Sequence, residues 1–451
     1  MMNLNCRLRL NGAMPRVLGY FFMFFLYVSF MEDQLPNGFG WADYHAYRVF
    51  NAVEYLRVNG YLSSLGFSIW SSCRDCDLQA SAWEGKIYLS GSALTFWPYI
   101  LLNHFFGKEL LFSVGPLIDK AVIFLTGALV AELFLRQTQD SGQVFHSTPA
   151  KWWMGCVLAT LFFTSAWSYQ MYRAMWNDIW FLFFLLIAIS LFLKARIKTV
   201  LFFVFLASFM HPISGLIFGF VYAVFLLLSK VFDEPAAFKS FIPQSIVTPK
   251  SILILSGVAA IPALISIVLR NVYTSVVNYQ ASGSSLLSRI GVAGDDIHNG
   301  GILGALQFLG GARITVCLSS LKATLGEIDL ISKITAFNCT LSILGMALLS
   351  ILSLFGVLWV LKTKESTRYF LFPILMILLC SASLLQQSFS AHLMGHSYIF
   401  AVLFACGLGG LVLKAAERIG SPSISLLVLS PAIVAIVLLS LRVSMLIGVP
   451  G

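Results

Sequence analysis

Only 11% of the residues in this chain are charged, so its few clusters of ionisable side chains are the natural places to look for chemistry. His392 and His396 are four residues apart, a spacing that puts both rings on one helix face, where they could contact a phosphate or a metal ion. Without a third ligand, phosphate contact is the stronger interpretation. A second cluster, Asp295, Asp296 and His298, lies in a glycine-rich stretch that could hold a divalent cation, form a substrate lid or serve as a flexible connector.

The segment 41–56 combines an acidic start with helical spacing of its apolar residues. These recur at intervals of three and four: Tyr47, Val49, Phe50, Val53 and Leu56. The spacing predicts an amphipathic helix that lies on a membrane surface. Asp43 stands at its start, where a carboxylate can cap free N–H groups and interact favourably with the helix dipole. We expect a second interfacial helix near residues 95–100.

The elements that hold these residues must be strongly apolar. The chain has 451 residues, of which 58% are hydrophobic, and a mean hydropathy of +0.85. A soluble domain carries about 25% charged residues, so the composition excludes an ordinary cytosolic enzyme and a disordered chain. The net charge of +9 comes from scattered basic residues, which argues against a nucleic-acid partner. In a membrane protein, such an excess reflects topology and anionic lipids.

We therefore predict an all-α protein, a polytopic transmembrane helical bundle of about eleven spans. The apolar runs that predict these spans cover residues 17–30, 110–135, 152–170, 177–193, 199–210, 213–229, 251–270, 338–361, 369–386, 397–413 and 424–447. His211-Pro212 divides the 199–229 stretch into a hairpin, because proline ends the helix before it.

An N-terminus inside the cell gives a self-consistent topology. Short segments rich in Lys and Arg then fall in the cytoplasm, as the positive-inside rule expects: 136–151, 194–198, 230–250, 362–368 and 414–418. Two long segments fall outside: a first outer loop at 31–106, with the interfacial helices, and a second at 271–337. Residues 1–450 thus form a single integral membrane domain whose chemistry is expected on the outer face.

Several motifs of this chain occur in an order that is typical of one enzyme class. They are Asp43-Tyr44-His45-Ala46-Tyr47-Arg48 with Asn59-Gly60-Tyr61, the Gly85 to Trp97 segment, Phe106-Gly107-Lys108-Glu109, and Tyr172-Arg173-Ala174-Met175-Trp176-Asn177-Asp178. In these features, over about the first 230 residues, the chain resembles the GT-C class of membrane glycosyltransferases, in particular the aminoarabinose-transferase and protein mannosyltransferase-like branch. Two features differ from that branch: Leu89-Ser90-Gly91-Ser92-Ala93 follows the Gly-x-x-Tyr turn, and Asp43-Tyr44 replaces an Asp-Glu pair.

The resemblance implies a polyprenyl-phosphate-linked sugar as donor, a lipid, glycan or protein as acceptor, and a reaction at the non-cytoplasmic face. It makes Asp43 the candidate base or acceptor-orienting acid, since an acceptor must lose a proton as it attacks the anomeric carbon. The lipid phosphate that leaves needs cations or hydrogen-bond donors. The outer-face candidates for substrate binding are Arg48, Lys86, Arg173, Asp178, His392 and His396. A divalent cation is the one cofactor left open.

Each of these residues also has a purely structural interpretation. Asp43 and Asp178 could be helix caps, and Arg173 could anchor to lipid headgroups. If Asp43 is only a cap, Glu32 or Asp33 is the carboxylate that would replace it in the reaction.

Other polar residues have no place in the proposed reaction. Cys73 and Cys76 could form a local disulfide on the outer face. Asp119 and Lys120 are adjacent inside the second span, so each is expected to find a partner elsewhere.

Two other functions would fit the same spans. A multispan transporter or flippase for a lipid-linked or anionic solute should show two similar halves with broken helices at matching positions, whereas this chain shows only the His211-Pro212 break. A polysaccharide polymerase or ligase would place its key Arg and His residues in a large later loop. We expect a multi-pass location in a bacterial inner (plasma) membrane, with membrane lipids as neighbours and the active site facing outward.

Overall fold

The computed structural model describes residues 4–34, 41–69, 77–79, 93–138, 148–165, 168, 177–192, 196–231, 249–276, 330–363, 370–372, 374–376 and 397–448. Its helices are α1 (Leu4–Gln34), α2 (Trp41–Asn59), the 3₁₀ turn η2 (Ala93–Phe96), α3 (Trp97–Thr138), α4 (Thr148–Phe163), α6 (Asn177–Phe192), α7 (Ile197–Met210), α8 (Pro212–Val231), α10 (Pro249–Val276), α14 (Leu330–Thr363), α17 (Ser397–Ile419) and α18 (Pro422–Gly448). These described parts contain no strand, which confirms the all-α prediction.

The predicted apolar runs coincide with helices, except that 369–386 is described only at 370–372 and 374–376. The break at His211-Pro212 is confirmed. The His211 Nδ1 accepts a hydrogen bond from the backbone N–H of Ser214 at 3.2 Å, so the histidine caps the start of α8. Helix α4 ends before its predicted run does, because the hydroxyls of Ser165 and Ser168 donate to the carbonyl of Phe162 at 2.8 and 2.6 Å.

Two helical segments are long and apolar enough to cross a membrane, Ile252–Tyr273 in α10 and Ile399–Ile419 in α17, and they indicate membrane association. The two segments differ in how much protein surrounds them: 22% of the first and 78% of the second is buried inside the protein. The other apolar helices that this criterion finds in the described ranges are shorter. A count of eleven spans is therefore not confirmed.

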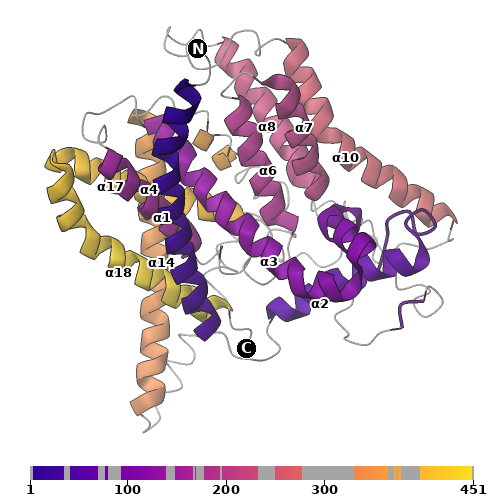
Figure 1. The fold of residues 1–451 in the computed structure, drawn as a ribbon, viewed down its shortest axis with the longest axis horizontal. Coiled ribbons are helices and arrows are strands. Elements are labelled where there is room, and N and C mark those ends of the chain that lie inside the picture. Colours follow the sequence, from indigo (N-terminus) through magenta and orange to yellow (C-terminus); the bar gives the residue numbers. More distant parts are fainter. Residues whose placement is uncertain are drawn as a thin grey trace, which may run out of the picture.

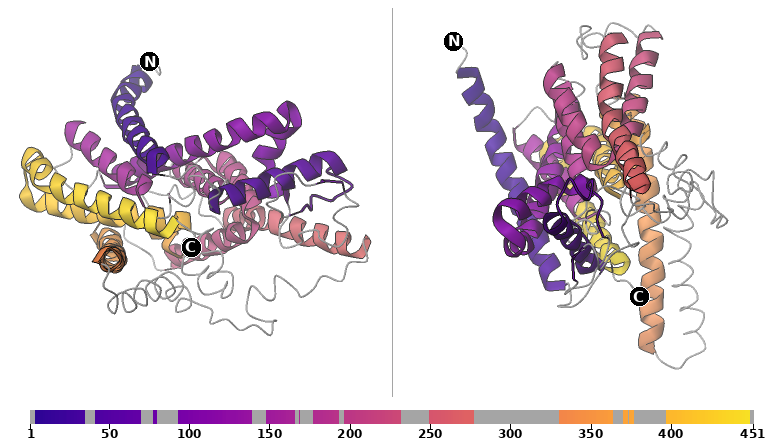
Figure 2. Two further views of the ribbon diagram at one scale, coloured as in Figure 1. Left: turned by 90° about the horizontal axis from the view of Figure 1, so that it is seen from below. Right: turned by 90° about the vertical axis from the view of Figure 1, so that its right-hand side faces the viewer.

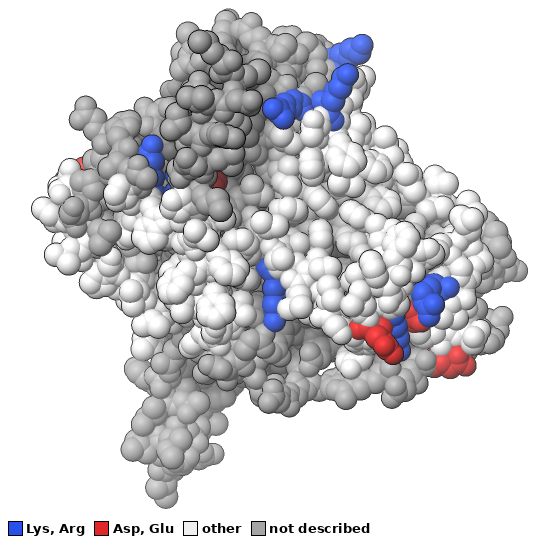
Figure 3. Space-filling view, in the orientation of Figure 1, with Lys and Arg blue, Asp and Glu red and all other residues white. Residues whose placement is uncertain are grey.

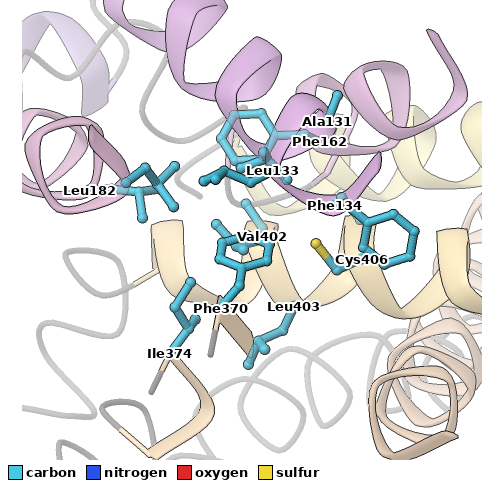
Figure 4. Packing of buried hydrophobic residues seen from close by; sticks show 14 of the residues in the cluster. Ala131, Leu133, Phe134, Phe162, Leu182, Phe370, Ile374, Val402, Leu403 and Cys406 are labelled. Carbon is cyan, nitrogen blue, oxygen red and sulfur yellow. The ribbon is translucent and has the colours of Figure 1, made fainter. Parts of the chain in front are cut away.

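The main core forms where helices from both halves of the chain meet. Helix α17 packs on α14 and α4, α6 on α7, and α8 on α10, while α3 contacts α4 and α6. Figure 1 shows α7, α8 and α10 on one side of α3, with α1, α4, α17 and α18 on the other. One end of α14 projects beyond the other helices (Figures 1 and 2). In the close view of Figure 4, Val402 lies toward Phe162 and Cys406 lies beside Phe134, while Leu403, also on α17, points away from both rings.

Helix α3 is the element that positions the candidate site, and it changes direction at Gly107. Gly107 has φ 83° and ψ 173°, backbone angles that side chains with a Cβ rarely adopt. We call residues 97–106 the first arm and 108–138 the second arm. The predicted second helix near 95–100 corresponds to η2 and the first arm, which the non-helical Gly107 separates from the second arm and its predicted span; its interfacial position stays a prediction.

Helices α14 and α17 approach each other through small residues. A Cβ added to Gly407 would overlap the carbonyl oxygen of Ser353, and one added to Gly356 would overlap the carbonyl of Gly407. The Ser353 hydroxyl donates to the carbonyl of Leu403 at 2.8 Å. Glycine is required at these two positions because the overlapping atoms belong to the partner helix backbone.

Large apolar side chains remain exposed on several outer helices. They include Leu18, Phe21, Phe22 and Phe25 of α1, Leu253, Leu264 and Val268 of α10, Leu344, Leu348 and Phe355 of α14, and Leu427 and Leu438 of α18. Figure 3 shows one face with few charged atoms, which lie mainly near its upper edge and at its lower right. Soluble monomers rarely expose apolar surface on this scale.

Candidate active site

Helix α2 is amphipathic as predicted, but protein covers its apolar face. Val49, Phe50, Val53 and Leu56 form a buried cluster with Phe96, Tyr99, Ile100 and Leu111 of η2 and both arms of α3. The expectation that this face lies on the membrane is therefore wrong. Periodicity identified the apolar face correctly, but not the neighbour that covers it.

Two of the predicted site residues, Asp43 and Arg48, lie on α2. Asp43 is in the first turn, a position suited to a capping carboxylate, and the structure describes its backbone but not its side chain. Arg48 is part-buried and directly precedes the apolar cluster. Packing on α3 thus fixes the helix that carries both residues.

Glu54 of α2 is a buried carboxylate that the sequence analysis missed. The Arg57 guanidinium donates two hydrogen bonds to it, at 2.8 and 2.6 Å, and the Asn103 amide donates a third at 2.8 Å. The hydrogen bonds from Arg57 hold the pKa of Glu54 below its ordinary value, although burial acts in the opposite direction; Asn103 adds to the lowering. The available signal was its spacing, because Glu54 follows Phe50 by four residues and precedes Arg57 by three.

A second buried carboxylate, Asp119, joins the two arms of α3 to α6. The Tyr99 hydroxyl of the first arm donates to Asp119 Oδ1. The Trp180 Nε1 of α6 lies 3.1 Å from both that oxygen and the Tyr99 hydroxyl. Asp119 is 1% exposed, and its Oδ2 is buried without a hydrogen-bond partner. As expected for adjacent residues on a helix, Asp119 bonds to distant elements rather than to Lys120.

Tyr99 contacts both α2, the helix that carries Asp43, and α6, the helix that carries Asp178. Its ring belongs to the cluster that holds α2, and its hydroxyl contacts Asp119 and Trp180. Asp178 is the second residue of α6, two positions before Trp180; the structure describes its backbone but not its side chain. The helices that carry Asp43 and Asp178 in their first turns are thus both fixed to one stretch of α3. We call Glu54, Asn103, Tyr99, Asp119 and Trp180 the α2–α3–α6 junction.

Charged and aromatic side chains meet beside this junction at the Gly107 bend. Arg57 is half-exposed, and Lys108 lies 5.7 Å from the centre of the Phe112 ring. Phe105 and Phe106 are 70% and 65% exposed. Figure 3 shows a mixed acidic and basic group at the lower right, the side on which α2 lies in Figure 1. The arrangement places basic groups next to an exposed apolar surface.

The remaining predicted residues lie outside the described ranges. They are Lys86, Arg173, His392 and His396, together with Cys73, Cys76, Asp295, Asp296 and His298. Glu32 and Asp33, the substitutes for Asp43, lie in the last turn of α1, where only the backbone is described. Among the described residues, no group of three or more His, Cys, Asp or Glu side chains could hold a metal ion. A cation at Asp295 and Asp296 stays a prediction.

The described site thus consists of two buried carboxylates and the two helices that carry the candidate acids. Both carboxylates accept hydrogen bonds from neighbouring elements, so they can fix the positions of these elements relative to one another. The C-terminal ends of α2 and of the first arm are exposed and can meet a ligand. The chain matches none of the protein-family models and none of the curated proteins with which it was compared.

Proposed function

We propose that the protein is a GT-C-like glycosyltransferase that moves a sugar from a polyprenyl-phosphate donor to a lipid, glycan or protein acceptor at the non-cytoplasmic face. The observation that carries the proposal is the double contact of Tyr99. Through it, the helix that carries Asp43 in its first turn and the helix that carries Asp178 in its first turn are held on the same part of α3. That arrangement suits two acids that act on one substrate pair.

A multi-pass position in the membrane is supported by the apolar surface. The exposed Leu, Ile and Phe side chains of α1, α10, α14 and α18 would be covered by lipid tails, which removes their contact with water. The candidate spans in α10 and α17 belong to the same bundle. We infer about eleven spans, with the polyprenyl-phosphate donor pointing to a bacterial inner (plasma) membrane and an outward-facing site.

In the proposed reaction, Asp43 takes the proton from the acceptor hydroxyl or amide. The acceptor atom forms a bond to the anomeric carbon while the bond from that carbon to the phosphate oxygen breaks, so the lipid phosphate leaves with the electron pair. Arg48, Lys86, Arg173, His392 and His396 are the candidates to stabilise its negative charge, and Asp178 is the candidate to bind sugar hydroxyls.

The Gly107 bend suits the polar head of such a donor. Phe105 and Phe106 present an exposed apolar surface just before the bend, and Lys108 follows Gly107 on its other side. An isoprenoid tail could contact the apolar surface while the phosphate approaches Lys108 and Arg57. Arg57 is already paired with Glu54, so the charge of Lys108 is the one at the bend that supports a phosphate-bearing lipid as ligand.

One observation favours the alternative of a transporter or flippase. Asp119 is an ionisable residue buried within an apolar helix, and such residues mark ion or substrate pathways in transporters. The two functions differ in their products, because only a transferase forms a glycosylated acceptor and releases polyprenyl phosphate.

The test is a transfer assay with the purified chain in lipid nanodiscs. A panel of polyprenyl phosphates with radiolabelled sugars is offered together with a membrane extract as the acceptor source. The wild type should glycosylate an acceptor, and Asp43→Asn should lower kcat at least about 100-fold, because it keeps the shape and removes the base. Glu109→Gln, which alters an exposed carboxylate of α3, is the matched control and should retain activity.

Full activity of Asp43→Asn would remove Asp43 from the mechanism. If the wild type transfers no sugar from any donor but equilibrates a labelled polyprenyl-phosphate sugar across a vesicle membrane, the transferase proposal is wrong and the flippase alternative holds.

A further inference from the structure

We propose that Asp119 is a positioning residue for this transfer reaction: it fixes the first turn of α6 against the first arm of α3, and so sets the place of Asp178 relative to α2. The inference rests on the proposed function. Asp119 itself need not contact the substrate, because its effect passes through Tyr99 and Trp180.

The geometry of the carboxylate supports this role. One oxygen of Asp119 accepts hydrogen bonds from two elements, the first arm of α3 and α6, whose donors are 20 and 61 residues away in the sequence. The Trp180 N–H is shared between Asp119 and the Tyr99 hydroxyl. The three side chains therefore form a closed triangle, and movement of any one element lengthens hydrogen bonds to the other two.

The ring contacts around the triangle do not by themselves define how α6 is aligned along α3, so this alignment depends on the hydrogen bonds. The rings of Trp97 and Phe184 stack with 14° between their planes, and Trp180 and Phe184 have centroids 5.9 Å apart. The burial of these rings is itself a non-directional contribution, and the offset and tilted geometries that ring pairs prefer span a wide range of centroid distances. A hydrogen bond has a preferred distance and angle, so the triangle defines where α6 begins along α3.

The composition of the site argues against a purely stabilising purpose. A buried carboxylate is costly, and the Asp119 Oδ2 that lacks a hydrogen-bond partner adds unfavourable desolvation. An apolar residue packs an apolar core without that cost. The cost of a carboxylate at position 119 is explained if its role is to orient the Tyr99 hydroxyl and the Trp180 N–H rather than to stabilise the fold.

The triangle lies close to Asp178 in the sequence and is connected through Tyr99 to α2, the helix that carries Asp43. Asp178 precedes Trp180 by two residues, which is about 3 Å along a helix axis, so a shift of Trp180 displaces Asp178 almost equally. On the other side, the Tyr99 ring packs in the cluster that holds α2. A misplacement of about 1 Å in an active site can cost about 100-fold in rate.

The experiment compares three variants with a control on the same helix. Asp119→Leu removes the acceptor, Asp119→Asn keeps an oxygen that can accept from both donors, and Tyr99→Phe keeps the ring but removes its hydroxyl. Thr126→Val is the control, because the buried Thr126 hydroxyl donates only to Val122 of its own helix. The measurements are kcat and KM for sugar transfer, and amide hydrogen exchange of α6 without substrate.

We expect Asp119→Leu to lower kcat about 100-fold with KM changed less than about threefold, since the donor still binds but the acids are misaligned. Tyr99→Phe should show a smaller loss of the same kind. In both variants the first turn of α6 should exchange its amide hydrogens faster than in the wild type. Asp119→Asn and Thr126→Val should match the wild type in both measurements.

The inference is wrong if Asp119→Leu and Tyr99→Phe keep the wild-type kcat, or if Asp119→Asn is as inactive as Asp119→Leu, which would assign a role to the charge itself. If the wild type transfers no sugar, the proposed function is wrong and Asp119 has no role in sugar transfer. Hydrogen exchange tests the structural part of the inference separately, because it reports without any substrate whether Asp119 fixes the first turn of α6.

Discussion

The α2–α3–α6 junction and the α14–α17 interface bury polar atoms in opposite ways. At the junction, two carboxylates that are costly to bury accept hydrogen bonds from side chains of other elements. Between α14 and α17, glycines bring two backbones together, and Ser353 satisfies a main-chain carbonyl without any charge. The second solution yields close packing at little electrostatic cost. The chain therefore uses ionisable groups where direction matters, and small residues where only stability does.

This comparison predicts that added side-chain volume destabilises the α14–α17 interface, whereas the loss of hydrogen bonds impairs the α2–α3–α6 junction. The first should change stability without a specific effect on the reaction. The second should affect the reaction even where the stability loss is modest. The following changes are arranged by the size of the expected effect on stability.

The largest effect is expected for Gly407→Ala. Its Cβ would overlap the carbonyl oxygen of Ser353, and the backbone of α14 can move away only if the two helices separate. We expect a loss of about 3 kcal/mol in the free energy of unfolding. The measurement is unfolding in mixed micelles by titration with sodium dodecyl sulfate. Gly257→Ala is the control, because nothing lies within 4 Å of a Cβ there, and it should stabilise α10 by about 0.5–1 kcal/mol.

A smaller loss, about 2 kcal/mol, is expected for Glu54→Leu. It leaves the buried Asn103 amide without its acceptor and releases Arg57, which is half-exposed and can be solvated by water. The same titration measures the change. Adding Asn103→Leu should recover part of the loss, because the stranded amide is removed with its acceptor. If the double variant is no more stable than Glu54→Leu, the hydrogen bond between the two residues is not the cause.

The same residue predicts how stability depends on pH. The pKa of Glu54 is lowered in the folded protein, so its contribution is present above the ordinary value of about 4.3 and is lost as the pH falls toward the folded value. The free energy of unfolding should therefore decrease on acidification below about pH 4.3. In Glu54→Gln this part of the decrease should be absent. Equal slopes for the two proteins between pH 3 and 5 would contradict the assignment.

The smallest effect is expected for Tyr20→Phe, at a contact outside both regions. Its hydroxyl donates to Glu132 at 3.0 Å, while Arg16 holds the same carboxylate through two further hydrogen bonds at 2.8 and 3.2 Å. Loss of one of three donors should cost about 0.5–1 kcal/mol. Sugar transfer by this variant should equal that of the wild type at a temperature where both are folded. A selective loss of kcat would extend the functional region beyond the junction.

The sequence predicted the places of the helices well and their neighbours poorly. Apolar runs located α6, α8 and α17, and the proline rule located the break before Pro212. The periodicity of α2 identified its apolar face, but apolar residues that meet lipid and those that meet protein look alike. Only the tertiary structure shows that α3 covers that face.

The site was predicted in part for the same reason. Asp43 and Asp178 were proposed from the order of motifs in the chain and stay predictions, and the structure adds that their helices share α3. Glu54 and Asn103 were missed because each looks like an ordinary polar residue of an amphipathic helix, and only the packing shows that both are buried. The partners of Asp119 depend on the bend at Gly107, whose positive φ cannot be inferred from a single glycine between Phe106 and Lys108.

The central claim is that α2 and α6 bring Asp43 and Asp178 to one substrate site. An experimental structure of the protein in a nanodisc with a bound polyprenyl phosphate would test it most directly. The account predicts that the Asp43 and Asp178 carboxylates and the Arg173 guanidinium line one cavity on the outer face, open to the bilayer, with the lipid phosphate beside them. If Asp43 instead points into water, far from Asp178 and from the phosphate, it is only a helix cap, and the glycosyltransferase proposal is contradicted.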